Sequence, residues 1–157
     1  MLSNIKKRTE GFTIIEVLIV LAIAGLILLI VFLAVPALQR NSRNTQVKNA
    51  ASAILGAVSE YQNNNQGLAP TTAAISGTTL TISGAAGTTP STAKVQSGYT
   101  VDTSGSMPAS GTTGAFSISL GHKCNGNAFD STSTPRAVAI GYNIETGSST
   151  ANQCVES

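Results

Sequence analysis

The chain has 157 residues, of which 42% are hydrophobic, 4% aromatic and 10% charged. Soluble domains carry about 25% charged residues, so this chain offers few side chains for acid–base chemistry. Nine basic and seven acidic side chains give a net charge of +2, which is too little clustered basic charge for a surface that binds nucleic-acid phosphates. The length allows one domain with an extension.

The basic character of the chain belongs to a short leader. Lys6, Lys7 and Arg8 stand against Glu10 within the first eleven residues. From Phe12 onward the chain has six basic and six acidic side chains. The part of the chain that follows the leader is therefore balanced in charge.

An apolar segment follows the leader. Residues 17–35 read VLIVLAIAGLILLIVFLAV and contain no charge and no hydrogen-bonding side chain. Together with residues 12–16 they predict a helix of roughly 36 Å, longer than the hydrocarbon core of a bilayer at about 30 Å. By the positive-inside rule, the basic leader predicts a cytoplasmic N-terminus and an exported remainder.

This segment differs from other export signals. A secretory signal has an apolar region of about 7–15 residues and then a small-x-small cleavage site, whereas this run is longer and continues into polar helical sequence. No cysteine precedes Cys124, which argues against a lipoprotein anchor. A plain membrane anchor leaves Glu16 unexplained, because a carboxylate in hydrocarbon is costly unless it is neutralised, hydrated at the interface or paired with a cation.

The residues around Glu16 resemble the class III signal of type IV pilin precursors, a family that includes the pseudopilins. The run GFTIIEVLIVLAIAG begins at Gly11 and follows a basic leader. The resemblance implies that a membrane prepilin peptidase cuts between Gly11 and Phe12 and methylates the new amine of Phe12. It places Glu16 at the acidic position of the family, whereas Pro36 comes a few residues later than the usual helix proline.

The resemblance also gives the Glu16 carboxylate a partner. In a filament of staggered copies, the amine of Phe12 in one copy can approach Glu16 of a neighbour, and a wrong stagger leaves a buried charge unpaired. The apolar helix exchanges lipid contacts for contacts with other copies, so association depends on packing. We expect the helix to loosen between Gly25 and Pro36, because both are poor residues for a helix interior.

The helix is predicted to continue beyond the membrane. Apolar side chains recur at intervals of four, three, four and three residues, at Val47, Ala51, Ile54, Val58 and Tyr61. This spacing predicts an amphipathic helix whose apolar stripe packs on a sheet; a stripe that binds a partner is the alternative. We predict one helix from about Phe12 to about Asn65, bent near Pro36.

Short alternating segments follow the helix. They predict antiparallel strands at 79–83, 93–101, 115–120 and 137–144, with glycine-rich turns at 105–114 and 125–127. The predicted fold class is α+β, with a long N-terminal helix, membrane-spanning in its first half, on a small C-terminal antiparallel sheet, similar to type IV pilins. The predicted divisions are a cleaved leader (1–11), a membrane and filament-core helix (12–36), its amphipathic continuation (37–66) and an exported β-rich head (67–157).

The predicted head holds both cysteines of the chain, Cys124 and Cys154. An even count in an oxidising compartment predicts a disulfide, and the pair resembles the disulfide loop near the C-terminus of many type IV pilins. The alternative is two free thiols in a host that does not oxidise its exported proteins.

The residues offer little for catalysis. The single histidine, His122, stands in a predicted loop, and one histidine with two cysteines does not complete a zinc site of four protein ligands. Asp102, Asp130 and Glu145 are isolated in the sequence. We therefore expect no catalytic residue, no metal and no cofactor, and we expect the chain not to be an enzyme.

The resemblance implies a structural function, that of a major type IV pilin. The chain would be a single-pass precursor in the inner membrane and then part of an extracellular filament for adhesion, twitching motility or DNA uptake. Its partners would be further copies of itself, the membrane, the prepilin peptidase, the assembly ATPase and the platform protein, with a host surface or DNA as external targets. The alternatives are a minor pilin, a secretion-system pseudopilin, or a membrane-anchored head that adheres or binds DNA.

Overall fold

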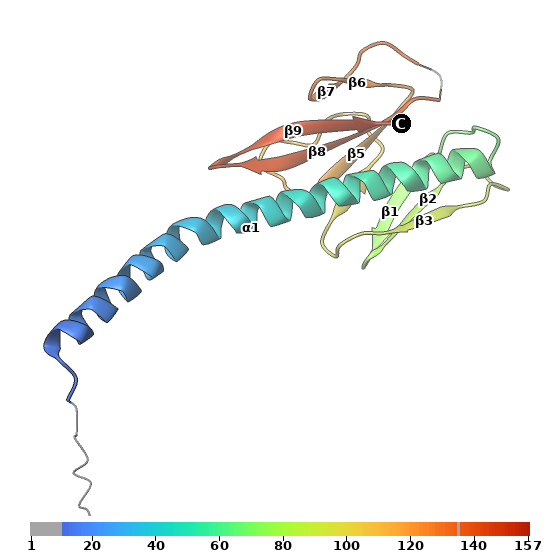
Figure 1. Cartoon of the computed structure of the whole chain (residues 1–157). Coiled ribbons are helices and arrows are strands. Elements are labelled where there is room, and N and C mark those ends of the chain that lie inside the picture. Colours follow the sequence, from blue (N-terminus) through green and yellow to red (C-terminus); the bar gives the residue numbers. More distant parts are fainter. Residues whose placement is uncertain (1–10, 135) are drawn as a thin grey trace, which may run out of the picture. The chain divides into compact units, whose positions relative to one another are not determined.

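The computed structural model describes residues 11–134 and 136–157. Within these residues the chain forms one α-helix and nine β-strands, shown in Figure 1. The chain divides between Gln39 and Arg40 into two compact units. The fold class is α+β, as predicted.

The helix α1 (Ile14–Asn64) contains residues of both units. Its bounds agree to within two residues with the predicted helix, and Pro36 lies inside it. In the first unit its large apolar side chains are exposed. Among the described residues, α1 is long and apolar enough to cross a membrane. A bend at Pro36 stays a prediction.

In the second unit, the rest of α1 lies along the strands (Figure 1). The predicted apolar stripe is confirmed as its buried face, which also includes two further alanines: Val47, Ala50, Ala51, Ile54, Ala57, Val58 and Tyr61. The strands complete the same core with Leu80, Ile82, Phe116, Ile118, Val138, Ile140 and Tyr142. These residues alternate along their strands with residues on the opposite face of the sheet, as expected for strands that turn one face to a helix.

The strands form three sheets. The first contains β1 (Thr72–Ser76), β2 (Thr79–Ser83) and β3 (Ser91–Lys94), all antiparallel. The second has the order β4-β5-β8-β9, with β4 (Thr100–Asp102), β5 (Ala115–Leu120), β8 (Val138–Thr146) and β9 (Ser149–Glu156). The third is a short hairpin of β6 (Cys124–Asn125) and β7 (Ala128–Phe129).

The predicted strands need two corrections. β2 and β5 have the predicted bounds, but the single strand expected at 93–101 is wrong, because the chain turns at Gly98, where φ is +88°, and forms β3 and β4 on either side. The sheet is not wholly antiparallel, since β4 runs parallel to β5. Strands β1, β6, β7 and β9 were not predicted.

Both faces of the four-stranded sheet are covered. On the face opposite α1, the buried residues of this sheet are small or of moderate size: Ser117, Ser119, Ala139, Gly141 and Asn143. A Cβ added to Gly141 would lie 2.7 Å from Met107 Sδ and 2.8 Å from Phe129 Cζ. Small residues on this face therefore allow the loop that contains Met107 and the hairpin that contains Phe129 to pack closely on the sheet.

The end of α1 is held by an asparagine. Asn65 Nδ2 donates to the carbonyl oxygens of Tyr61 and Thr89, both at 2.8 Å, and the Thr89 N–H donates to Asn65 Oδ1 at 2.7 Å. The Gly67 N–H donates to Gln62 O at 2.6 Å, and Gln66, directly before it, has a left-handed backbone with φ +58°. Such a six-to-one bond across a left-handed residue is typical of a Schellman helix end. The hydrogen bonds of Asn65 fix the loop around Thr89 beside the helix end.

Candidate functional site

The first turn of α1 contains a reciprocal cap. The Thr13 N–H and the Thr13 hydroxyl donate to Glu16 Oε2 at 2.9 and 2.7 Å, and the Glu16 N–H lies 3.4 Å from Thr13 Oγ1. This is a capping box, in which a threonine before the helix and a glutamate three residues later satisfy the free N–H groups of the helix start. The sequence therefore begins the helix at Ile14 and fixes the Glu16 side chain in one place.

The cap leaves part of the carboxylate available. Both bonds from Thr13 go to Oε2, and no other described residue donates to Glu16 Oε1. The capped carboxylate thus keeps one oxygen free to accept a bond from a cationic donor. In hydrocarbon, such a donor would offset the cost of burying the charge.

The predicted cleavage position lies just before the cap and is accessible. Phe12 is 90% exposed, and among the described residues no atom lies within 4 Å of a Cβ added at Gly11. Neither residue belongs to the helix, so the peptide bond between them lies outside the helical hydrogen-bond ladder. The leader residues Lys6, Lys7, Arg8 and Glu10 lie outside the described residues. Cleavage after Gly11 and methylation of Phe12 stay predictions.

The predicted flexible segment is helical in the structure. Gly25 and Pro36 both lie within α1. Proline has no N–H, so at Pro36 the carbonyl four residues earlier, that of Phe32, has no ordinary helical donor. The loosening of the helix between Gly25 and Pro36 stays a prediction about the filament.

A second cluster holds the tip of the β8–β9 hairpin on α1 in the second unit. Arg43 Nε and Nη2 donate to the two carboxylate oxygens of Glu145 at 2.8 and 2.7 Å. Asn44 Nδ2 donates to Glu145 O at 2.9 Å, and the Glu145 N–H donates to Asn44 Oδ1 at 2.8 Å. The hydrogen bonds from Arg43 hold the pKa of Glu145 below its ordinary value.

The predicted disulfide is present. Cys124 on β6 and Cys154 on β9 are bonded, with their Cα atoms 5.7 Å apart and a separation of 30 positions in sequence. The Cys124 N–H also donates to Glu156 Oε2 at 2.5 Å. The bond therefore attaches the β6–β7 hairpin to the outer strand of the four-stranded sheet.

The described residues contain no group of three or more His, Cys, Asp and Glu side chains that could hold a metal ion. His122 Nδ1 lies 2.9 Å from the carbonyl oxygen of Asp130, in the loop before β6. Burial raises the pKa of Asp102, but hydrogen bonds from Ser104 and Ser117 outweigh it, so the pKa is lowered overall. These contacts fix loops and assemble no reacting group.

The roles of two sets of residues were not predicted from the sequence. Thr13 was not assigned a role, although the pattern Thr-x-x-Glu before an apolar run is a known signature of a helix start. The contacts of Asn44 and Arg43 with Glu145 join residues about one hundred positions apart, and no local pattern indicates them.

The comparison with protein families found one match. Residues 6–32 match the family described as the prokaryotic N-terminal methylation motif. Neither the comparison with curated proteins nor that with solved structures found a match. The chain therefore carries the signature of type IV pilins, which pseudopilins share. It is the signature of a membrane-anchored precursor that a prepilin peptidase processes.

Proposed function

We propose that this chain is the major subunit of a type IV pilus. The observation that carries the proposal is the methylation motif at residues 6–32, which includes the start of the exposed apolar helix α1 and its capped carboxylate Glu16. A peptidase that cuts after Gly11 leaves an amine on Phe12, four residues before Glu16. The filament would grow when assembly brings this amine close to Glu16 of a neighbouring copy.

The free oxygen of the capped carboxylate supports this pairing. Thr13 occupies Oε2 of Glu16, and Oε1 has no donor among the described residues. A methylated amine that keeps its positive charge is a suitable donor for this oxygen. A copy inserted at the wrong height would leave both charges unpaired in an apolar environment, which is costly. The pair would therefore set the axial position of each subunit.

The apolar part of α1 supports a filament core. Its side chains would contact lipid before assembly and the same helix of other copies afterwards, so hydrophobic transfer contributes little and close packing decides. Extraction from the membrane then needs work, which an assembly ATPase and a platform protein would supply. The second unit would form the filament surface, for adhesion, twitching motility or DNA uptake.

Minor pilins and pseudopilins carry the same motif, so abundance and position test the proposal. Cells that produce the chain would be labelled with an antibody against the second unit and with immunogold. The share of this chain in the total protein of sheared fibres would be measured. A major subunit labels the whole shaft and dominates the sheared protein. Labelling confined to fibre ends or to the cell membrane would contradict the proposal.

A further inference from the structure

One long stretch of the second unit carries no charged side chain. Between Glu60 and Lys94 there are 33 residues without Asp, Glu, Lys or Arg. They include the end of α1 and almost all of the β1-β2-β3 sheet. About a quarter of the residues in soluble domains are charged, whereas charged residues are depleted at the centre of protein interfaces. This stretch therefore has the composition of a contact surface.

The stretch contains an exposed apolar tip. Leu68 is 56% exposed and is the one large hydrophobic side chain of the described second unit that is exposed. The Thr71 N–H donates to Ser83 O at 3.0 Å, so the segment after Leu68 runs beside the end of β2. We call "the tip" the exposed apolar side chains of these two neighbouring segments: Leu68, Ala69, Ala85 and Ala86.

An open groove lies between α1 and the chain that follows β3. It has a volume of about 270 Å³ and six lining residues, which define "the groove": Gln46, Asn49, Ala50, Lys94, Val95 and Gln96. Ala50 and Val95 are less than 10% exposed and form an apolar floor. The amide side chains at the rim can donate and accept hydrogen bonds. A small apolar group with peptide groups around it fits such a site.

The tip and the groove lie at opposite ends of the second unit. Ala50 precedes the last residue of α1, Asn64, by 14 positions, which corresponds to about 21 Å along a helix. The tip follows that last residue. A contact between two different ends of identical molecules is heterologous and repeats from copy to copy, so it forms an open polymer when the rotation does not close a ring.

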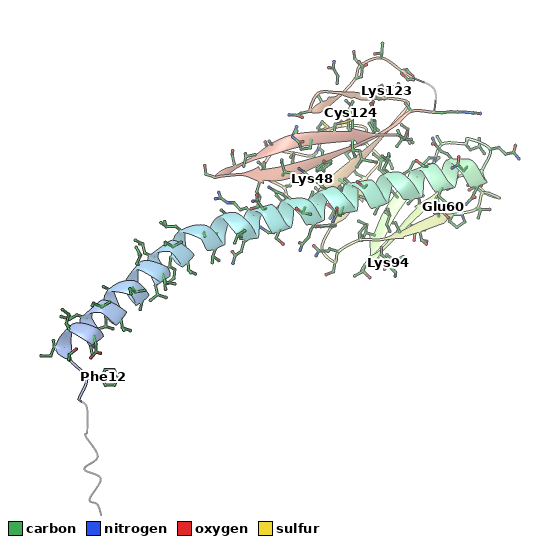
Figure 2. All side chains as sticks on the ribbon, in the orientation of Figure 1. Phe12, Lys48, Glu60, Lys94, Lys123 and Cys124 are labelled. Carbon is green, nitrogen blue, oxygen red and sulfur yellow. A yellow bond between two sulfur atoms is a disulfide. The ribbon has the colours of Figure 1, made fainter. Side chains whose placement is uncertain are left out.

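Glu60 near the end of α1 and Lys94 at the groove have opposite charges. Figure 2 shows Glu60 near the end of α1 and Lys48 nearer its middle, and both side chains are exposed. Lys94 is exposed at the groove, where its Nζ donates to Thr79 Oγ1 at 2.7 Å. Arg136 also lies at the tip end, packed against Gly67. Opposite exposed charges favour one orientation of approach more than they add affinity.

We propose that the tip of one copy docks in the groove of the next copy. Leu68 would cover Ala50 and Val95, and the amides of the rim would bind the peptide groups beside Leu68. Glu60 of one copy would face Lys94 of the other. The inference rests on the proposed function, because it adds a contact between heads to the packing of the apolar helices.

A pair of introduced cysteines tests the contact in fibres of the full chain. The chain would carry Leu68→Cys and Gln96→Cys together, and sheared fibres would be treated with a short bismaleimide and separated on reducing gels. Docking predicts a ladder of covalent multimers. Leu68→Cys alone and Leu68→Cys with Ser148→Cys, which places the second thiol at the exposed β8–β9 turn, are the matched controls and should give no ladder.

A second pair of variants tests the apolar contact without a reagent. Leu68→Met keeps an apolar side chain of similar size, whereas Leu68→Asn places a polar group against Ala50 and Val95. We expect fibres of Leu68→Asn to dissociate at a lower temperature and those of Leu68→Met to match the parent. Normal fibres that give no ladder and no change in dissociation temperature would overturn this inference. A ligand other than a second copy of the chain in the groove of these fibres would also overturn it. Absence of fibres from the parent chain would overturn the proposed function.

Discussion

Thr13 and Glu16 form a reciprocal cap at the start of α1. The threonine hydroxyl donates to the carboxylate at 2.7 Å, and the Thr13 N–H donates to the same oxygen at 2.9 Å. The acidic residue of the methylation motif thus has a function within its own chain, in addition to the one proposed between chains. The two functions differ in what they require, because a cap needs an acceptor and a pair with an amine needs a charge.

Three substitutions separate the two functions of Glu16. Glu16→Gln keeps an acceptor for the capping box but removes the charge, whereas Glu16→Ala removes both. If the charge sets the position of the subunit, both variants insert and are cleaved but form few or no fibres. Thr13→Ala, which weakens the cap and keeps the charge, should form fibres. Fibre counts by electron microscopy, with leader cleavage followed by mass, measure this. Normal fibres with Glu16→Gln would exclude the pairing.

The contact of Asn44 with Glu145 predicts a loss of stability. Asn44→Ala removes two hydrogen bonds that hold the β8–β9 hairpin on α1, and we expect about 1–2 kcal/mol of destabilisation. Asn41→Ala is the matched control, since no hydrogen bond of its side chain occurs among the described residues. Thermal unfolding of the full chain in detergent, followed by circular dichroism, would compare them. Equal unfolding temperatures would show that the contact adds nothing.

The pKa values of two carboxyl groups predict acid sensitivity. Hydrogen bonds from Arg43 lower the pKa of Glu145, and hydrogen bonds from Ser104 and Ser117 lower that of Asp102 against the effect of burial. A carboxyl group whose pKa is lower in the folded chain stabilises it above the ordinary pKa, and this is lost as the pH falls through the folded value. We expect the unfolding temperature to decrease when the pH is lowered past about 4. In Glu145→Gln this decrease should be less steep. The same pH dependence in the variant would exclude a contribution from Glu145.

Replacing a glycine by alanine should have opposite effects on stability at two positions, Gly84 and Gly56. A Cβ at Gly84 would lie 2.0 Å from the hydroxyl oxygen of Tyr61, a fully buried side chain, so Gly84→Ala should destabilise the chain by about 1–3 kcal/mol. Gly56 lies on α1, and apart from the backbone of the helix itself no described atom lies within 4 Å of such a Cβ, so Gly56→Ala should stabilise the chain by roughly 0.5–1 kcal/mol. Urea unfolding measures both, and a tolerated Gly84→Ala would contradict the packing of Tyr61.

Much of the fold follows from local pattern. The apolar stripe of α1 and the strands β2 and β5 have the periodicity that burial on one face requires, and the structure places them as predicted. β9, with the sequence STANQCVE, has no strong alternation. It is a strand because it pairs along β8 from Ser149 to Glu156, which depends on a partner that a local pattern does not contain.

The same limit applies to the site. The residues near the cleavage position form one short segment, so a resemblance to a family motif assigns roles to Gly11, Phe12 and Glu16, and these roles stay predictions. The parallel pairing of β4 with β5 joins strands that a loop separates, and the turn at Gly98 before β4 interrupts a segment whose local pattern resembles one strand. The contacts of Asn44, the tip and the groove join residues far apart in sequence, so no local pattern indicates them.

The central claim is that the chain is cut after Gly11, methylated and built into a filament. Fibres would be sheared from cells that produce the full chain together with its assembly machinery, and the N-terminal peptide of their protein would be analysed by mass. We predict a peptide that begins with N-methylated Phe12. Fibres without this protein, or a chain in them that retains its leader, would contradict the account.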